Sequence, residues 1–396
     1  MAHMTEHTLT EAARGGDPLA LARLLVATPS VNPELETGGA GEQRIADIAA
    51  RLLERWGLDT DLLTLGSGRA NVVATLAGTG PTLLLNGHLD TVGVERMTIE
   101  PFEPEVRAGR LFGRGSCDMK GGVAALLAAT ARLAADGTRP NLVVALTADE
   151  EHASIGMEAY VRSGPRADCA VVCEPTGLRV MPAHKGFVWV RASFRGRAAH
   201  GSRPDLGVDA IRHAALYVAA LDDYVRELRA AAAHPLLGHP SMHAGTIQGG
   251  TADSVYPDRC DVVLERRTMP GERPEDVLRE LEAFLERLRA REPSVDATLE
   301  VTLSRNGTEV SEQSVVVRGL LSAGAEHGVS PHVEGMSAWV DAALLNEAGI
   351  PAVCYGPGSI DQAHTAEEWI EVDQISTCAD VLETFARALA RRPADR

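Results

Sequence analysis

The sequence contains only two lysines, Lys120 and Lys185, so arginine carries nearly all of its positive charge. The formal net charge is -17 at pH 7. A nucleic-acid surface needs a stripe of basic side chains, so this charge balance argues against a nucleic-acid partner. The sequence also lacks an uninterrupted apolar run of the roughly 18 residues that a membrane-spanning helix needs, and we expect no membrane partner.

Cysteine is sparse, and the six cysteines include no C-x-x-C pair. The first residues, MAHMTEHTLTEAARGGDP, lack the apolar segment of a secretory leader. Cysteines without such a pair, in a long chain without a secretory leader, are typical of a reducing compartment, so we expect a soluble, cytoplasmic protein. The opening MAHM resembles an expression-vector remnant.

A dinucleotide-binding motif is missing as well. No G-x-G-x-x-G follows the first strand and opens a helix, which argues against a Rossmann-type enzyme. What residues 17–180 do show is an alternation of helical patterns with apolar strand runs. These runs are NVVATLAG, TLLLNG, LVVALTA and CAVVC. Such alternation predicts an α/β fold with a mainly parallel sheet.

From about residue 184 the pattern changes to half-exposed strands and long amphipathic helices. KGFVWVRASFRG and RCDVVLERRT alternate apolar and polar residues, and the order of elements fits β-α-β-β-α-β. After about residue 304 the α/β pattern resumes. We therefore predict a catalytic domain at 4–183 and 305–396, with an inserted ferredoxin-like α+β domain at 184–304.

Metal-binding residue types follow several of the apolar runs of the first domain. They are His88 and Asp90, Asp149, Glu150 and Glu151, Glu174, and His364, with Asp118 before a glycine-led helix. Ligands of an open parallel sheet bind beyond the carboxyl ends of its strands, so these side chains should meet at one edge. Imidazoles and carboxylates together suit a pair of divalent metal ions, most naturally zinc. Such a pair activates water for amide hydrolysis without a Ser or Cys nucleophile.

These segments resemble a known enzyme family. GHLDTV, GRGSCDMKGG, TADEEHAS, CEPTG, AAHGSRPDLGVDAI and GPGSIDQAHT are similar to motifs of the acetylornithine deacetylase, succinyl-diaminopimelate desuccinylase and carboxypeptidase family of di-zinc amidohydrolases. The resemblance covers nearly the whole chain in order. It implies a zinc-peptidase type catalytic domain and an inserted lid that mediates formation of a homodimer.

The resemblance also implies a role for each residue of the site. It assigns one metal to His88 and Glu174, the other to Glu151 and His364, and a bridging position to Asp118. Asp90 would orient the imidazole of His88. Glu150 would act as general base toward a metal-bridged water. The peptide bond after Asp118 is expected to be cis. An alternative general base is Asp149. Alternative metal ligands are the thiolates of Cys117 and Cys173. Zinc is the expected metal, with cobalt or manganese as alternatives.

The expected reaction is hydrolysis of the amide of an N-acyl amino acid, as in acetylornithine deacetylase; the alternative is a metallocarboxypeptidase or dipeptidase that cleaves a C-terminal peptide bond. In the family, Glu at position 174 marks both classes, and both bind a substrate carboxylate. Arg267, Ser254 and Gly358 are the candidate substrate-binding residues, although Ser254 replaces the usual asparagine of the family. His200 is expected to act across the dimer interface on the oxyanion.

Overall fold

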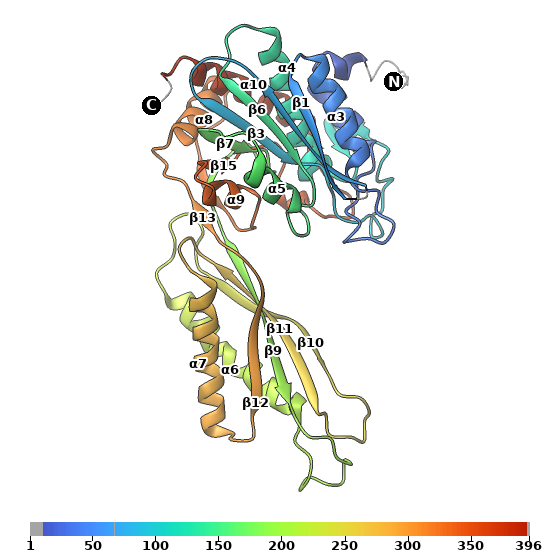
Figure 1. Cartoon of the computed structure of the whole chain (residues 1–396), viewed down its shortest axis with the longest axis vertical. Coiled ribbons are helices and arrows are strands. Elements are labelled where there is room, and N and C mark those ends of the chain that lie inside the picture. The colour runs from blue at the N-terminus through green and yellow to red at the C-terminus, as the bar shows by residue number, and fades with distance from the viewer. Residues whose placement is uncertain (1–10, 67, 394–396) are drawn as a thin grey trace. The chain divides into compact units, whose positions relative to one another are not determined.

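The computed structural model describes residues 11–66 and 68–393, and the contacts within the chain divide it into two compact units (Figure 1). The first unit contains the chain up to Pro182, then Val310–Glu334 and the residues from Val340 onward. The second contains Ala183–Glu309 and Gly335–Trp339. The sequence pattern predicts boundaries after residues 183 and 304 and does not separate the segment 335–339. Residues 4–10 and 394–396 of the predicted catalytic domain, and the MAHM segment, lie outside the described residues.

The first unit combines long helices with a large sheet. Its helices are α2 (Pro18–Val26), α3 (Gln43–Arg55), α4 (Gly121–Ala135), α5 (Ile155–Ser163), α8 (Val315–Glu326), α9 (Ala342–Glu347) and α10 (Val372–Ala390), with the short turns η1 (Ser116–Lys120) and η2 (Ile360–Gln362). Its strands are β1 (Asp59–Gly66), β2 (Arg69–Leu76), β3 (Thr82–His88), β4 (Glu105–Arg107), β5 (Arg110–Phe112), β6 (Asn141–Thr147), β7 (Cys169–Val172), β15 (Ala352–Cys354) and β16 (Trp369–Glu371). Strands β8 (Val180–His184) and β14 (Val333–Met336) run from the first unit into the second.

The central strands of the first unit are parallel. The sheet follows the order β1-β2-β6-β3-β7-β15-β8. Strands β6, β3, β7 and β15 pair in parallel, whereas β1, β2 and β8 are joined antiparallel. This confirms the α/β class with a mainly parallel sheet at its centre. His88 pairs with Thr147 where β3 and β6 both end, so the carboxyl ends of these strands meet at one edge.

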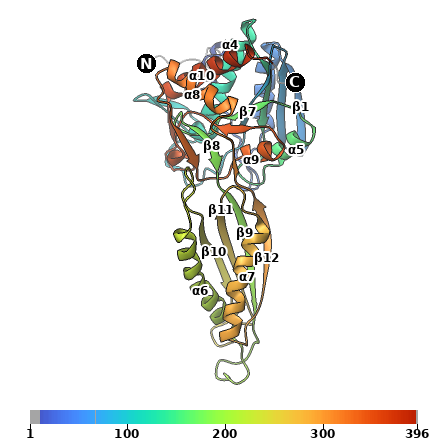
Figure 2. The same ribbon diagram turned by 90° about the vertical axis from the view of Figure 1, so that its left-hand side faces the viewer.

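Both faces of the central strands are covered by helices. Alternate residues of a strand point to opposite faces, and Leu83 and Leu85 join one continuous apolar core with residues of α2, α3, α4, α8 and α10. Leu84 is equally buried on the opposite face, where α5 contacts β6 and α9 contacts β15. Figure 2 shows α4, α8 and α10 on one side of the sheet, with α5 and α9 on the other. Coverage of both faces explains why these strands are unbroken apolar runs.

The helices of the first unit differ in how much of their surface is buried. Helix α3 buries one stripe that includes Ile45 and Leu53, and it ends before Gly57, whose φ of 86° suits a glycine. Helix α4 is buried on nearly every side, which explains its small apolar residues. Within the described part of the chain, no helix is both long and apolar enough to cross a membrane.

The second unit has the predicted β-α-β-β-α-β order. Its elements are β9 (Gly186–Arg195), α6 (Ala210–Ala230), β10 (Ser241–Gly249), β11 (Arg259–Thr268), α7 (Pro274–Arg291) and β12 (Asp296–Arg305), followed by the short β13 (Thr308–Glu309). The sheet is antiparallel in the order β10-β11-β9-β12, so β10 lies at an edge. Alternate residues of β9 and β11, such as Val190 and Leu264, form a separate core with α6 and α7.

Candidate metal centre

The residues predicted to bind metal lie beyond the carboxyl ends of the parallel strands. His88 is the last residue of β3, residues 149–151 follow β6, and Glu174 follows β7. Asp118 lies in η1 directly before α4, and the peptide bond between Asp118 and Met119 is cis, as the family resemblance implies. His364 follows η2 in the segment after β15. The fold therefore brings residues from five separate stretches of sequence to one edge.

Asp118 lies between the two imidazoles. Its Oδ1 atom is 3.2 Å from Nε2 of His88, and its Oδ2 atom is 3.4 Å from Nε2 of His364. Nε2 of His364 is also 3.0 Å from a carboxylate oxygen of Glu151. One ligand atom each from His88, Asp118 and Glu151 lie within 4.8 Å of one another. A carboxylate placed between two imidazoles in this way is suited to bridging two cations.

Glu174 supplies a further acceptor. Its side chain is buried, and among the described residues its Oε1 atom has no hydrogen-bond partner. Burial raises the pKa of Glu174 to about 8. Leaving a buried acceptor without a partner is costly, and a cation at this position would remove that cost. The donor set of imidazole nitrogens and carboxylate oxygens therefore fits divalent metal ions.

The charges of the centre shift the pKa values of its members in opposite directions. Hydrogen bonds with Asp118 and then Glu151 raise the pKa of His364 to about 10. Burial disfavours the ionised form of Asp118, but its hydrogen bonds with His364 and His88 prevail and lower its pKa. Burial, and then the negative charge of Asp118, raises the pKa of Glu151. The carboxylates therefore favour a positive charge at the centre, and a bound cation would supply that charge.

A backbone carbonyl fixes the ring of His88. Nδ1 of this buried imidazole lies 3.0 Å from the carbonyl oxygen of Asp90 and 3.5 Å from its carboxylate. Because a carbonyl oxygen only accepts, Nδ1 carries the hydrogen, and the lone pair of Nε2 points to the centre. The carboxylate of Asp90 also accepts hydrogen bonds from the backbone N–H groups of Glu150 (3.1 Å) and Glu151 (3.2 Å). Asp90 therefore links the His88 strand to the Glu150–Glu151 turn.

Asp149 and Glu150 have different surroundings although they are adjacent. Oδ1 of Asp149 is 2.8 Å from the guanidinium of Arg69 and accepts a hydrogen bond from Asn32 at 3.0 Å. Asp149 is thus held in a buried polar network that also includes the Arg69–Glu42 ion pair. Burial and then the charge of Glu174 raise the pKa of Glu150 well above its usual range. A glutamate with a raised pKa is suited to accept a proton, as a general base does.

The two candidate thiolate ligands are buried in packing contacts. Sγ of Cys117 lies 3.2 Å from the carbonyl oxygen of Ser359, and burial raises the pKa of both Cys117 and Cys173 well above the usual range. A thiol with a raised pKa is a poor metal ligand, because metals bind the thiolate.

Gly358, a candidate substrate-binding residue, has a φ of 84°, and an added Cβ there would lie 2.6 Å from Cys117 Sγ. The absence of a side chain therefore allows the backbone of Gly358 to approach Cys117 closely. The N–H of Gly358 donates to Gln374.

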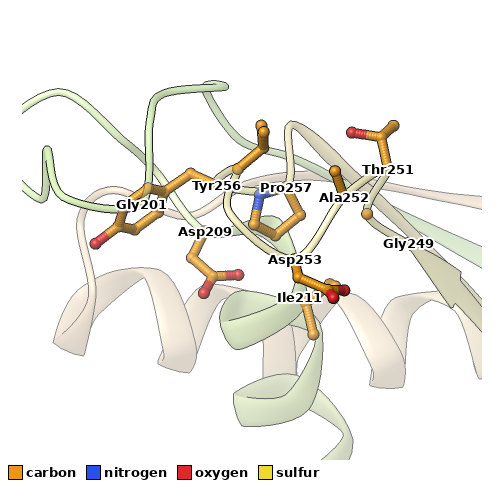
Figure 3. A pocket seen from close by; sticks show the side chains of 11 residues that line it. Gly201, Asp209, Ile211, Gly249, Thr251, Ala252, Asp253, Tyr256 and Pro257 are labelled. Atoms are coloured by element: carbon orange, nitrogen blue, oxygen red, sulfur yellow. The ribbon is translucent and has the colours of Figure 1, made fainter.

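The remaining candidates belong to the second unit. His200 is exposed and forms an isolated β-bridge with Val255, and the N–H of Gly201 donates to the carbonyl of Ser254 at 2.7 Å, so the His200 and Ser254 segments lie side by side. A cavity of about 650 Å³ borders these segments (Figure 3). Asp209, Ile211 and Tyr256 are among its lining residues, and none of the candidate metal ligands lines it. All of its lining residues belong to the second unit.

Several residues that shape the centre have no recognisable signal in the sequence. Asn32 donates to both Asp90 (2.8 Å) and Asp149, and the buried Glu368 accepts from the backbone N–H groups of Cys117 and Asp118. Asp341 is buried near Thr147, and burial raises its pKa to about 7. These contacts join residues far apart in the chain, so they follow from the folded structure alone.

The fold and this donor set define the chain as a metal-dependent hydrolase of amide bonds. It matches Peptidase family M20/M25/M40 over residues 84–388 and belongs to that family. An acetylornithine deacetylase from Myxococcus xanthus is 33% identical over 356 residues, which is 87% of this chain and 91% of the relative.

Solved structures share the fold. A tripeptidase from Staphylococcus aureus aligns with a TM-score of 0.80 at 21% identity and covers 96% of this chain and 99% of its own. A dinuclear metal-binding M20 peptidase from Bacillus subtilis aligns with a TM-score of 0.73 at 16% identity, covering 95% of this chain and 98% of its own. At these sequence identities the similarity shows a shared fold and does not identify the substrate.

Proposed function

We propose that this enzyme is a two-metal deacylase that hydrolyses the amide bond of an N-acyl amino acid. The observation that carries the proposal is the similarity, over 87% of the chain, to an acetylornithine deacetylase. Glu174 supports the same class, because the family resemblance associates Glu at this position with deacylases and carboxypeptidases. A metallocarboxypeptidase or dipeptidase is the alternative, since both classes bind a substrate with a free carboxylate.

In this proposal two divalent ions occupy the centre. His88 and Glu174 would hold one, Glu151 and His364 would hold the other, and Asp118 would be shared by both. Zinc suits a set of imidazole and carboxylate ligands best, with cobalt or manganese as working substitutes. When bound, the ions supply Lewis-acid activation of water and of the amide carbonyl.

The six buried, unpaired cysteines support a reducing, cytoplasmic location.

Glu150 would carry the proton. Its carboxylate takes a proton from the attacking water and returns it to the leaving nitrogen, which needs a pKa above that of an ordinary glutamate. Burial and the neighbouring carboxylates supply this shift, and the hydrogen bond from the Glu150 N–H to Asp90 fixes the backbone of the base. The competing Asp149 is held by Arg69 and Asn32.

Arg267 would bind the substrate carboxylate. It lies on the helix-free side of β11, stacks over Phe187 at 5.6 Å, and donates through Nε to Glu265 at 2.6 Å. A guanidinium offers a planar fork for a carboxylate, which a lysine ammonium does not. The roles of Ser254 and Gly358 in substrate binding remain proposals from the family resemblance.

An array of N-acetyl, N-succinyl and N-formyl amino acids and of dipeptides, assayed for released amine, tests this function. We expect N-acyl amino acids to be cleaved and their carboxamide forms to be poor substrates. Arg267→Lys should lower kcat/KM by about 10- to 100-fold on carboxylate substrates only, the worth of a hydrogen bond between charged groups. Arg259→Lys is a matched control, because Arg259 pairs with Asp261 two residues away on the same strand. Cleavage restricted to dipeptides would establish the alternative.

The second unit has features suited to a homodimer. Strand β10 is an edge strand whose residues are nearly all exposed, and Ile247 on it is 53% exposed. Ile211 on α6 is also exposed. An edge strand presents unpaired backbone groups that a second copy can match around a two-fold axis. These observations support the proposal that the second unit is the lid and dimerisation domain.

His200 would complete the active site of the partner subunit. The backbone N–H of Ser202 donates to His200 Nδ1 at 3.2 Å, so the neutral ring carries its hydrogen on Nε2, which can donate to an oxyanion. The side chain that caps α6 is that of Asp209, so His200 is not the cap of this helix. His200→Ala should lower kcat by about 10²- to 10³-fold with little change in binding.

Mixed dimers test whether His200 acts in trans. Inactive Glu150→Gln chains mixed with inactive His200→Ala chains should regain one working site, because the first chain supplies the histidine and the second supplies the base. As a control, Glu150→Gln chains mixed with the double variant Glu150→Gln, His200→Ala should stay inactive. Failure of the first mixture to recover activity would show that His200 acts within its own chain.

A further inference from the structure

Glu368 forms an unusually complete set of contacts for a buried carboxylate. Its side chain is 1% exposed. Oε1 accepts hydrogen bonds from the backbone N–H groups of Cys117 (2.8 Å) and Asp118 (2.9 Å). Oε2 accepts from the N–H of Gly115 (2.8 Å) and from the guanidinium of Arg114 (2.9 Å). Four donors thus converge on one carboxylate, and three of them are amides of the segment that carries Asp118.

The guanidinium of Arg114 extends this network to two other segments. Nε donates to the carbonyl of Gly93 (3.1 Å), beyond the end of β3, and Nη1 donates to the carbonyl of Thr365 (3.3 Å), directly after His364. Arg114 is itself buried. The Arg114–Glu368 pair therefore ties the Asp118 segment to the segment that presents His364.

The two imidazoles depend on this network to different degrees. His88 ends a central strand, its side chain is 1% exposed, and its Nδ1 donates to the carbonyl of Asp90. The side chain of His364 is 51% exposed, and the residue lies in a loop with a positive φ of 61°. The fold holds His88 directly, whereas the position of His364 relative to Asp118 depends on how its loop is anchored.

We infer that Glu368 is a positioning residue that sets the spacing between Asp118 and His364 and thereby the affinity for the second metal ion. This inference rests on the proposed assignment of Glu151 and His364 to that ion. Glu368 touches neither ion nor substrate in this scheme; it acts through the backbone of the Asp118 segment. Replacing it should weaken the second site selectively, because the strand end and the Asp90 carbonyl still hold His88.

Titration of the metal-free enzyme with Co²⁺, followed by calorimetry and by the visible absorption of the bound ion, tests the inference without measuring activity. Glu368→Gln keeps the side-chain shape but turns an NH₂ group toward backbone N–H donors. We expect the first Co²⁺ to bind nearly as in the parent and the second to bind about 10- to 100-fold more weakly, as for other residues that support metal ligands. Arg114→Lys keeps the positive charge but loses the several N–H donors of the guanidinium, so it should lower the affinity for the second ion by a smaller factor.

Glu272→Gln provides a matched control in the second unit. Glu272 also accepts from an arginine, Arg266 (2.8 Å), and from a backbone N–H, that of Met269 (2.6 Å). This variant should bind both ions like the parent. The inference would be overturned if Glu368→Gln bound both ions like the parent, or if its affinity for both ions fell equally. If Glu368→Gln does not fold, the same two outcomes are judged on Arg114→Lys. A parent enzyme that binds fewer than two ions would contradict the proposed function instead.

Discussion

Removal of divalent ions by a chelator should reduce amide hydrolysis by this enzyme to the uncatalysed background, and added zinc or cobalt should restore it. The reason is that Asp118 lies within 3.4 Å of both His88 and His364, in a cluster of imidazole and carboxylate groups that suits divalent cations. Water alone is a poor nucleophile at neutral pH, and the activation that metal ions supply has no substitute among the neighbouring side chains. Metal content by mass spectrometry and released amine should fall and recover together.

The ligand assignment predicts the same loss without a chelator. The double variant His88→Ala, His364→Ala should bind no stoichiometric metal and should have no activity above background. His327→Ala, His332→Ala is a matched control in the same unit, because these exposed histidines contact Thr384 and Glu334, away from the cluster. Full activity in the first double variant would falsify the assignment.

Glu150→Gln should lower kcat by a factor of about 10² to 10⁴ or more while the metal content stays near that of the parent. Glutamine has nearly the same shape as glutamate but cannot accept a proton from water. Glu150 owes its raised pKa to burial and to the charge of Glu174, so the parent carboxylate is a stronger base than an exposed glutamate. Single-turnover rates and metal analysis on the same samples measure the two effects separately.

The adjacent residue provides the contrast. Glu151 contacts His364 at 3.0 Å and takes part in the cluster of ligand atoms, so Glu151→Gln should lose metal as well as rate. The two variants differ by one position in the chain and carry the same chemical change. If Glu150→Gln lost the metal and Glu151→Gln kept it, the roles of the pair would have to be exchanged.

Much of this arrangement could be predicted because it follows from local periodicity. The apolar runs before His88 and Glu174 are strands buried on both faces, and the parallel register of β3 and β6 brings their carboxyl ends together. Strand β11 covers Arg259–Thr268, the same ten residues that alternate in the sequence. The cis bond after Asp118 was accessible only through the family resemblance, because no local pattern indicates it.

Elements and contacts without such periodicity could not be predicted. Strand β10 is part of the predicted β-α-β-β-α-β order, but its residues could not be located in the sequence, because it is exposed along nearly its whole length and SMHAGTIQG shows no apolar alternation. The segment 335–339 belongs to the second unit through contacts such as that of Trp339 with Phe187, far away in sequence. Glu368 looks like an ordinary acidic residue until the fold places three backbone amides around it. Long-range polar contacts of this kind leave no spacing rule in the chain.

The burial of all six thiols makes this enzyme a convenient background for labelling chemistry. Buried cysteines with raised pKa values, such as Cys117 and Cys173, react slowly with maleimides and iodoacetamides, because these reagents attack the thiolate. A cysteine introduced on the exposed β10 strand would therefore be the preferred target without prior removal of native thiols. Fluorophores or spin labels attached there can test whether two copies pair along this strand, while the native packing around the metal centre stays unaltered.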